Sequence, residues 1–237
     1  MTYTNDVRHR LLILLISNLF FVIAAIFFFS KSDYPYIIQE RLGIKERITQ
    51  NNVSQTSWNK SIEQLNYDSD IVFFGDSLTI RTDFQAAYPD YKIFNFGCAG
   101  DNLTEMKSRT YVIKSLSPNK IFFLGGINSL SNCRIDKAIN MYRSIVDELL
   151  ADNPNAEIYV QSVLPVKDDR HLNDKIVEMN TLIKSLADEY DITYINLYPL
   201  FENDGIMKDE YTTDGTHLSE EGISVWLDAL QPYVTLQ

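Results

Sequence analysis

The sequence predicts an α/β fold, a three-layer α/β/α sandwich around a five-stranded parallel sheet. Five short apolar runs recur along the chain after residue 68, and amphipathic segments separate most of them. The runs are continuously apolar instead of alternating with polar residues, which is typical of strands covered by helices on both faces. The segments between the runs are long enough for the crossovers that join parallel neighbours.

Each expected strand is a run rich in β-branched and aromatic residues. The five runs are residues 71–74, 92–96, 120–124, 158–163 and 192–197. The expected helices carry apolar residues at spacings that form one face. They are residues 102–116, 135–151, 172–190 and 219–233. Together these elements predict one α/β domain over residues 67–237.

Composition and charge narrow the classes of partner. Of the 237 residues, 45% are hydrophobic and 22% are charged, as expected for one globular domain with an appendage. The formal net charge of −11 disfavours a phosphate backbone as partner, so we expect no nucleic acid binding. Zinc-protease, Walker and dinucleotide-binding motifs do not occur in the sequence, and we expect no cofactor and no metal.

Two cysteines, Cys98 and Cys133, are too few for a disulfide scaffold and do not form a C-x-x-C pair. Two interpretations stay open for them. They are small buried side chains, or they form a single bridge that joins two loops outside the cytoplasm.

The amino-terminal segment predicts a membrane anchor. Residues 11–29 run without a charge and, as a helix, would span roughly 28 Å, close to the thickness of a bilayer core. Arg8 and Arg10 precede the run, so residues 1–35 would be a cytoplasmic tail and signal anchor, with the rest of the chain outside the cytoplasm. A cleaved signal peptide is the alternative, although its apolar region is usually shorter. The polar residues 36–66 would form a stalk.

A serine lies where the first expected strand ends. The apolar run at residues 71–74 is followed by Gly75, Asp76 and Ser77, and the carboxyl ends of parallel strands are where open sheets bind ligands. A nucleophilic serine needs a base to take its proton, an acid to orient that base, and donors for the oxyanion. Taken alone, a serine in this place is more often a helix cap. We expect Asp76 to hydrogen-bond within the turn and not to act in catalysis.

His217 is the candidate base. The other two histidines are His9, ahead of the apolar segment, and His171, in a charged stretch. Asp214 precedes His217 by three residues, and Gly215 between them favours a turn that can fold the carboxylate back onto the imidazole. The orientation of the base would then be set locally.

Four short blocks of the chain resemble those of the SGNH hydrolase superfamily, also called GDSL esterases and lipases. The resemblance covers nearly the whole region from residue 71 to residue 233, and the blocks occur in order along it. They are Gly75-Asp76-Ser77-Leu78, Asn95-Phe96-Gly97 followed by Gly100, Gly125-Gly126-Ile127-Asn128 and Asp214-Gly215-Thr216-His217-Leu218-Ser219. The third block usually continues Gly-x-Asn-Asp, whereas this chain has Ser129, a departure that bears on substrate preference more than on activity.

The resemblance implies a flavodoxin-like sheet and a role for each block. Ser77 would be the nucleophile, His217 the base and Asp214 the residue that orients it. The oxyanion would be bound by the backbone N–H groups of Ser77 and Gly97 and by the side-chain amide of Asn128.

These residues predict a membrane-anchored serine esterase that hydrolyses carboxylic esters through an acyl-serine intermediate. The resemblance allows O-acetylated carbohydrates, lysophospholipids and other short acyl esters as substrates. Two alternatives stay open. One is an O-acyltransferase, in which a sugar hydroxyl intercepts the same acyl-enzyme. The other is a non-catalytic glycan-binding module on a membrane stalk.

Overall fold

The computed structural model describes residues 59, 60, 62 and 68–235. The anchor expected at residues 11–29 and most of the stalk expected at residues 36–66 lie outside the described residues. Within the described part, no helix is both long enough and apolar enough to cross a membrane.

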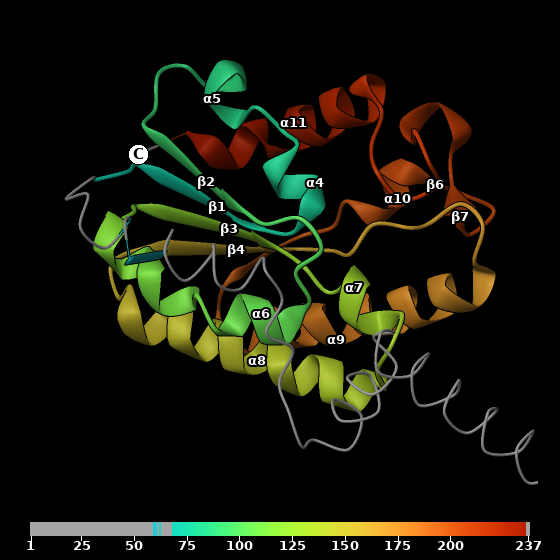
Figure 1. The fold of residues 1–237 in the computed structure, drawn as a ribbon, viewed down its shortest axis with the longest axis horizontal. Coiled ribbons are helices and arrows are strands. Elements are labelled where there is room, and N and C mark those ends of the chain that lie inside the picture. Colours follow the sequence, from blue (N-terminus) through green and yellow to red (C-terminus); the bar gives the residue numbers. More distant parts are fainter. Residues whose placement is uncertain (1–58, 61, 63–67, 236–237) are drawn as a thin grey trace, which may run out of the picture. The chain divides into compact units, whose positions relative to one another are not determined.

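A five-stranded parallel sheet forms the centre of the described domain (Figure 1). Its strands are β1 (Ile71–Gly75), β2 (Ile93–Gly97), β3 (Lys120–Leu124), β4 (Glu157–Gln161) and β5 (Thr193–Ile195). The strand order is β2-β1-β3-β4-β5, and each neighbouring pair is parallel. This is the doubly wound order of flavodoxin-like folds, so the predicted sheet is confirmed.

The last two strands end earlier than the sequence predicts. The expected strand at 158–163 stops at Gln161, and the one expected at 192–197 stops at Ile195. The hydroxyl of Ser162 accepts hydrogen bonds from the backbone N–H groups of Leu197 and Tyr198, each at 2.9 Å. A side chain therefore takes the backbone donors that a longer strand would have used, and the chain leaves the sheet there.

Helices cover both faces of the sheet (Figure 1). On one face lie α6 (Leu103–Lys107), the 3₁₀ helix η1 (Thr110–Leu116), α8 (Ile135–Asp152) and α9 (Arg170–Tyr190); on the other lie α4 (Ser77–Ile80), α5 (Phe84–Ala87) and α11 (Glu220–Val234). The remaining short elements are α7 (Ile127–Leu130), α10 (Tyr198–Phe201), the hairpin β6 (Glu202–Asn203) and β7 (Ile206–Met207), and η2 (Asp209–Tyr211). The helices predicted at 135–151, 172–190 and 219–233 are confirmed within a few residues.

The single helix predicted at 102–116 is wrong, because the structure divides it into α6 and η1. Two short polar side chains at the junction hydrogen-bond to backbone carbonyls three residues back. The Ser108 hydroxyl donates to the Glu105 carbonyl at 2.6 Å, and the Thr110 hydroxyl donates to the Lys107 carbonyl at 2.8 Å. Such bonds compete with the backbone ladder of a continuous helix. The break turns the Arg109 side chain into the interior, where it is 1% exposed.

The core consists of two apolar layers, one on each face of the sheet. Successive strand residues point to opposite faces, so Phe74 and Phe123 pack toward α8 whereas Phe73 and Phe122 pack toward α11. In the second layer the indole of Trp226 donates a hydrogen bond of 2.7 Å to the buried Gln161 side chain. The strands are buried on both faces, as their continuous apolar sequence predicts.

Two asparagines of α9 fix the loop that follows β4. Asn180 accepts from the backbone N–H of Val163 at 2.7 Å and donates to its carbonyl at 2.9 Å. About two turns earlier in the helix, Asn173 does the same for Val166, at 2.8 and 2.7 Å. Both side chains are buried. They satisfy backbone groups that have left the sheet and would otherwise be buried without partners.

We predict that Asn180→Leu lowers the free energy of unfolding by about 1–3 kcal/mol, because it leaves the backbone N–H and carbonyl of Val163 buried without partners. Asn140 on α8 is exposed and supplies the same substitution as a control, Asn140→Leu, which should change stability by less than about 0.5 kcal/mol. Urea unfolding followed by far-UV circular dichroism measures both. Equal stability of the two variants would contradict the role given to Asn180.

Candidate active site

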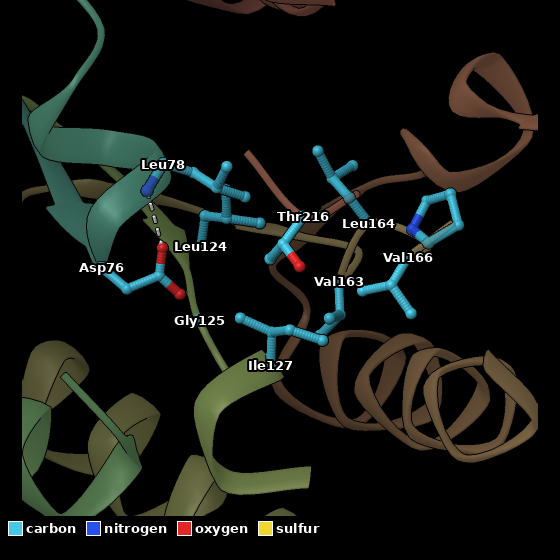
Figure 2. Close-up of a pocket in the computed structure, with 10 residues that line it drawn as sticks. Asp76, Leu78, Leu124, Gly125, Ile127, Val163, Leu164, Val166 and Thr216 are labelled. Carbon is cyan, nitrogen blue, oxygen red and sulfur yellow. Dashed lines mark hydrogen bonds between the residues drawn. The ribbon is translucent and has the colours of Figure 1, made fainter. Parts of the chain in front are cut away.

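Ser77 lies at the carboxyl edge of the sheet, directly after β1. Strand β1 ends at Gly75, Asp76 caps the next helix, and Ser77 is the first residue of α4. The Asp76 carboxylate accepts a hydrogen bond of 3.0 Å from the backbone N–H of Leu78 (Figure 2). The expected role of Asp76 in the turn is thereby confirmed. The turn holds the Ser77 hydroxyl at the surface of the site, where the side chain is half-buried.

The structure brings Ser77, His217 and Asp214 together, although 140 residues separate the first two. Nε2 of His217 lies 3.0 Å from Oγ of Ser77, and Nδ1 lies 2.6 Å from Oδ2 of Asp214. The other carboxylate oxygen, Oδ1, accepts from the backbone N–H groups of His217 at 2.8 Å and Thr216 at 3.1 Å. These bonds, first the one from the His217 backbone and then the one from its ring, hold the pKa of Asp214 well below its usual range.

The loop that carries His217 is tied to its surroundings through its backbone. The carbonyl of His217 accepts from the backbone N–H of Thr213 at 2.9 Å and from the hydroxyl of Thr212 at 2.8 Å. The carbonyl of Gly215 accepts from the backbone N–H of Lys167 at 2.9 Å. Ser219 then caps α11. The imidazole is therefore held in place before any substrate binds.

Asn128 lies in the first turn of α7, after β3. Its amide nitrogen donates to the backbone carbonyl of Asp101 at 2.9 Å. An asparagine amide carries two N–H groups, so the second is available to a ligand. The neighbouring Ser129, where the related sequences usually have aspartate, accepts the backbone N–H of Leu103 at 2.9 Å. Ser129 therefore joins the loop after β3 to the start of α6.

The surroundings of Gly97 do not favour its expected role as an oxyanion donor. Its backbone N–H is already bonded to the side-chain oxygen of Asn95, at 3.0 Å. A Cβ atom at residue 97 would lie 2.3 Å from the backbone nitrogen of Ile80 in α4. Glycine is needed there so that α4 can approach β2 closely, which is a packing requirement.

Gly100, in the same block, is a second candidate backbone donor, which the sequence reasoning did not assign. It has a φ of +81°, it is exposed, and a Cβ built on it would meet nothing within 4 Å. Among the described residues, no hydrogen-bond partner is recorded for its N–H. The left-handed conformation favours glycine. The signal was present in the sequence, because the second block includes Gly100 as well as Gly97.

The structure has an apolar pocket at this end of the sheet, and Figure 2 shows its lining residues. Leu78, Ile127 and Thr216 line it, and they are the chain neighbours of Ser77, Asn128 and His217. The other lining residues are Asp76, Leu124, Gly125, Val163, Leu164, Pro165 and Val166. The pocket is small, with a volume of about 10 Å³. Its walls include the loop that Asn173 and Asn180 hold.

Both cysteines are free thiols in the structure. The alternative of a bridge between Cys98 and Cys133 is therefore not realised, and Cys98 is a half-buried side chain beside the site. Burial raises the pKa of its thiol to about 11. Within the described residues, no group of three or more His, Cys, Asp or Glu side chains is arranged to hold a metal ion.

Residues 73–223 match the protein family described as GDSL-like Lipase/Acylhydrolase. The chain belongs to the GDSL-like lipase/acylhydrolase family. Membership confirms the resemblance to SGNH hydrolases and makes the chain a serine hydrolase that acts on carboxylic esters. The interpretation as a non-catalytic glycan-binding module is set aside. No curated protein matches the chain.

Solved structures of similar fold come from several bacteria. A Streptococcus pneumonia protein described as a candidate platelet activating factor is 25% identical, with a TM-score of 0.68, over 76% of this chain and 92% of its own. A GDSL-like lipase from Bacteroides thetaiotaomicron is 19% identical, with a TM-score of 0.66, over 78% and 97%. A variant of an acetylxylan esterase from Geobacillus stearothermophilus is 16% identical, with a TM-score of 0.60, over 72% and 96%.

The buried acid of this GDSL-like hydrolase predicts a pH dependence of stability. Burial raises the pKa of Asp76 to about 6, so the folded protein keeps a proton that the unfolded chain releases near pH 4. Between these values the stability of the wild type should fall as pH rises, by up to about 3 kcal/mol relative to Asp76→Asn. Unfolding by urea at pH 4, 5, 6 and 7 measures the difference.

Asp83→Asn is the matched control, because Asp83 caps α5 in the same way but at an exposed position. A constant difference in the free energy of unfolding between wild type and Asp76→Asn across this pH range would contradict the prediction, because it would show that Asp76 is ionised throughout.

Proposed function

We propose that this GDSL-like hydrolase cleaves esters of short acyl groups through a covalent acyl-Ser77 intermediate. One observation carries the proposal: a continuous set of hydrogen-bond contacts runs from the Ser77 hydroxyl through the His217 imidazole to the Asp214 carboxylate. That arrangement can remove a proton from the hydroxyl at the moment it attacks a carbonyl carbon.

His217 acts first as base and then as acid. Its Nε2 takes the Ser77 proton while Oγ forms a bond to the carbonyl carbon, and the same proton then passes to the departing alcohol. Asp214 holds the Nδ1–H and stabilises the imidazolium that forms, and its depressed pKa keeps it ionised for this task. In the second half, water attacks the acyl carbon while His217 takes its proton. The bond between that carbon and Oγ then breaks, His217 returns the proton to Oγ of Ser77, and the carboxylic acid is released.

The developing oxyanion is bound by three N–H donors. We propose the backbone N–H of Ser77 at the start of α4, the backbone N–H of Gly100 and the second amide N–H of Asn128. Gly100 replaces Gly97 in this role because the Gly97 N–H is bonded to Asn95. Preorganised donors of this kind typically contribute about 3–4 kcal/mol each to transition-state stabilisation.

The small apolar pocket supports an acetyl or similarly short acyl group. The chain neighbours of Ser77, Asn128 and His217 line it, and its small volume, about 10 Å³, favours a short acyl group over a long one. The acetylxylan esterase among the similar structures is named for a short acyl group of this kind. We therefore propose acetyl esters before long-chain esters.

We also propose that residues 11–29 anchor the enzyme in a membrane, with residues 36–66 as a stalk and the catalytic domain over residues 67–237 outside the cytoplasm. The support is the uncharged run and the arginines before it. Carbonate extraction of membranes from cells that express the full chain tests the anchor, because release of the protein into the soluble fraction would contradict it.

Replacing the proposed nucleophile tests the central claim. Ser77→Ala should lower kcat for p-nitrophenyl acetate by at least about 10³-fold with an unchanged melting temperature, and it should abolish labelling by a fluorophosphonate probe. Ser185→Ala removes an exposed serine hydroxyl on α9 and is the control, with wild-type activity and labelling. Undiminished hydrolysis by purified Ser77→Ala would disprove the proposal.

Acyl preference should follow the size of the pocket. The wild type should hydrolyse p-nitrophenyl acetate with a higher kcat/KM than the butyrate or the octanoate. Val163→Ala removes part of the pocket wall and should raise the butyrate-to-acetate ratio of kcat/KM by about tenfold. Val177→Ala makes the same change at a half-exposed position on α9 and should leave the ratio unchanged. A wild type that prefers octanoate would contradict the short-acyl assignment.

A further inference from the structure

Arg109 is a fully buried cation that takes no part in the proton transfers described above. It lies between α6 and η1 and is 1% exposed. Its guanidinium lies over two neighbouring aromatic rings, 4.7 Å from the ring centre of Phe74 and 4.5 Å from that of Phe96. Arginine is almost never buried without partners, so its contacts indicate what it does.

Its donors reach three separate segments of the chain. Nη2 donates to the carbonyl of Gly75 at 2.8 Å, and Nη1 donates to the carbonyl of Phe96 at 2.8 Å. Nε donates to the Asp101 carboxylate at 2.6 Å, in an ion pair whose side chains are 1% and 5% exposed. Gly75 and Phe96 lie at the carboxyl ends of β1 and β2, and Asp101 belongs to the loop after β2.

Each of these segments carries or contacts a proposed oxyanion donor. Gly75 is two residues before Ser77 in the chain, and Asp101 directly follows Gly100. The backbone carbonyl of Asp101 also accepts the first amide N–H of Asn128, at 2.9 Å. A single guanidinium is thus connected, through one residue or two, to all three donors.

Stability alone does not require an arginine here. Buried ion pairs contribute little net stability, and apolar side chains of similar volume often replace them without loss. What the guanidinium adds is a rigid, planar set of donors that fixes the directions of several acceptors at once. Donors to an oxyanion must be placed to within a fraction of an ångström, because misplacement by about 1 Å can cost about 100-fold in rate.

We propose that Arg109 is a positioning residue for the oxyanion-binding site, which sets the loop of residues 98–102 against the end of β1. It touches no reacting atom and acts through Asp101 and the two strand-end carbonyls. This inference rests on the proposed function, because the three N–H groups matter only if an oxyanion forms.

The test is Arg109→Lys, which keeps the charge opposite Asp101 but cannot reach three acceptors with a planar group. We expect kcat for p-nitrophenyl acetate to fall at least tenfold while KM stays within about twofold, because the lost alignment affects the transition state more than substrate binding. A kcat within twofold of the wild type in the folded variant would overturn the proposal.

Lys120→Met is the control for a merely structural effect. Lys120 is also a buried cation, 3% exposed, and it donates to the backbone carbonyls of Tyr233 at 2.9 Å and Thr235 at 2.8 Å. It lies at the first residue of β3, at the opposite edge of the sheet from Ser77. Its loss should lower the melting temperature without changing kcat. An equal fall in kcat for both variants would assign the Arg109 effect to stability and overturn the proposal.

Asp101→Asn provides a second route if Arg109→Lys does not fold. It keeps the shape of the side chain and the backbone carbonyl that Asn128 contacts, but removes the charge that holds Nε. We expect the same pattern, a lower kcat with little change in KM, and an unchanged kcat would overturn the proposal.

A failure of the proposed function can be told apart from a failure of the Arg109 inference. If wild-type protein itself hydrolyses no ester, or if Ser77→Ala retains activity, the proposed function fails, whatever the Arg109 variants do.

Discussion

The parallel arrangement of the sheet is the constraint on which the site depends. All five strands end at one edge, and the order β2-β1-β3-β4-β5 sends the chain in opposite directions after β1 and β3. A crevice forms at such a switch point. Ser77 follows β1 and Asn128 follows β3, so both lie at this crevice. Residues that are far apart in the sequence meet because burial on both faces requires parallel strands joined by crossovers.

Polar side chains in the interior then position the loops that leave this edge. Arg109 binds the ends of β1 and β2, and Asn173 and Asn180 bind the loop after β4. In each case a buried side chain binds backbone groups at or beyond the end of a strand. These contacts cost desolvation, but they give the loops one defined geometry. The hydrolase therefore combines an apolar core, which provides stability, with a few buried polar groups, which provide alignment.

Much of the architecture could be predicted, because its signals are local. The apolar runs identified all five strands, and the spacing of apolar residues identified the three long helices α8, α9 and α11. The predicted helix at 102–116 failed where Ser108 and Thr110 bond to nearby carbonyls, and two strands were predicted too long where Ser162 takes backbone donors. These errors share a cause: side-chain bonds to the backbone override propensities, and only the folded geometry shows which bonds form.

Motif spacing and hydrophobic pattern are properties of the chain. They were therefore sufficient to predict the family, the strands and the candidate residues Ser77, Asp214 and His217. The folded structure was needed to see which backbone N–H groups at the site already have a partner. It showed the Gly97 N–H bonded to Asn95, and it recorded no partner for the Gly100 N–H among the described residues. Whether an N–H group already has a hydrogen-bond partner depends on how the folded chain places the atoms around it. A local sequence pattern does not contain that information.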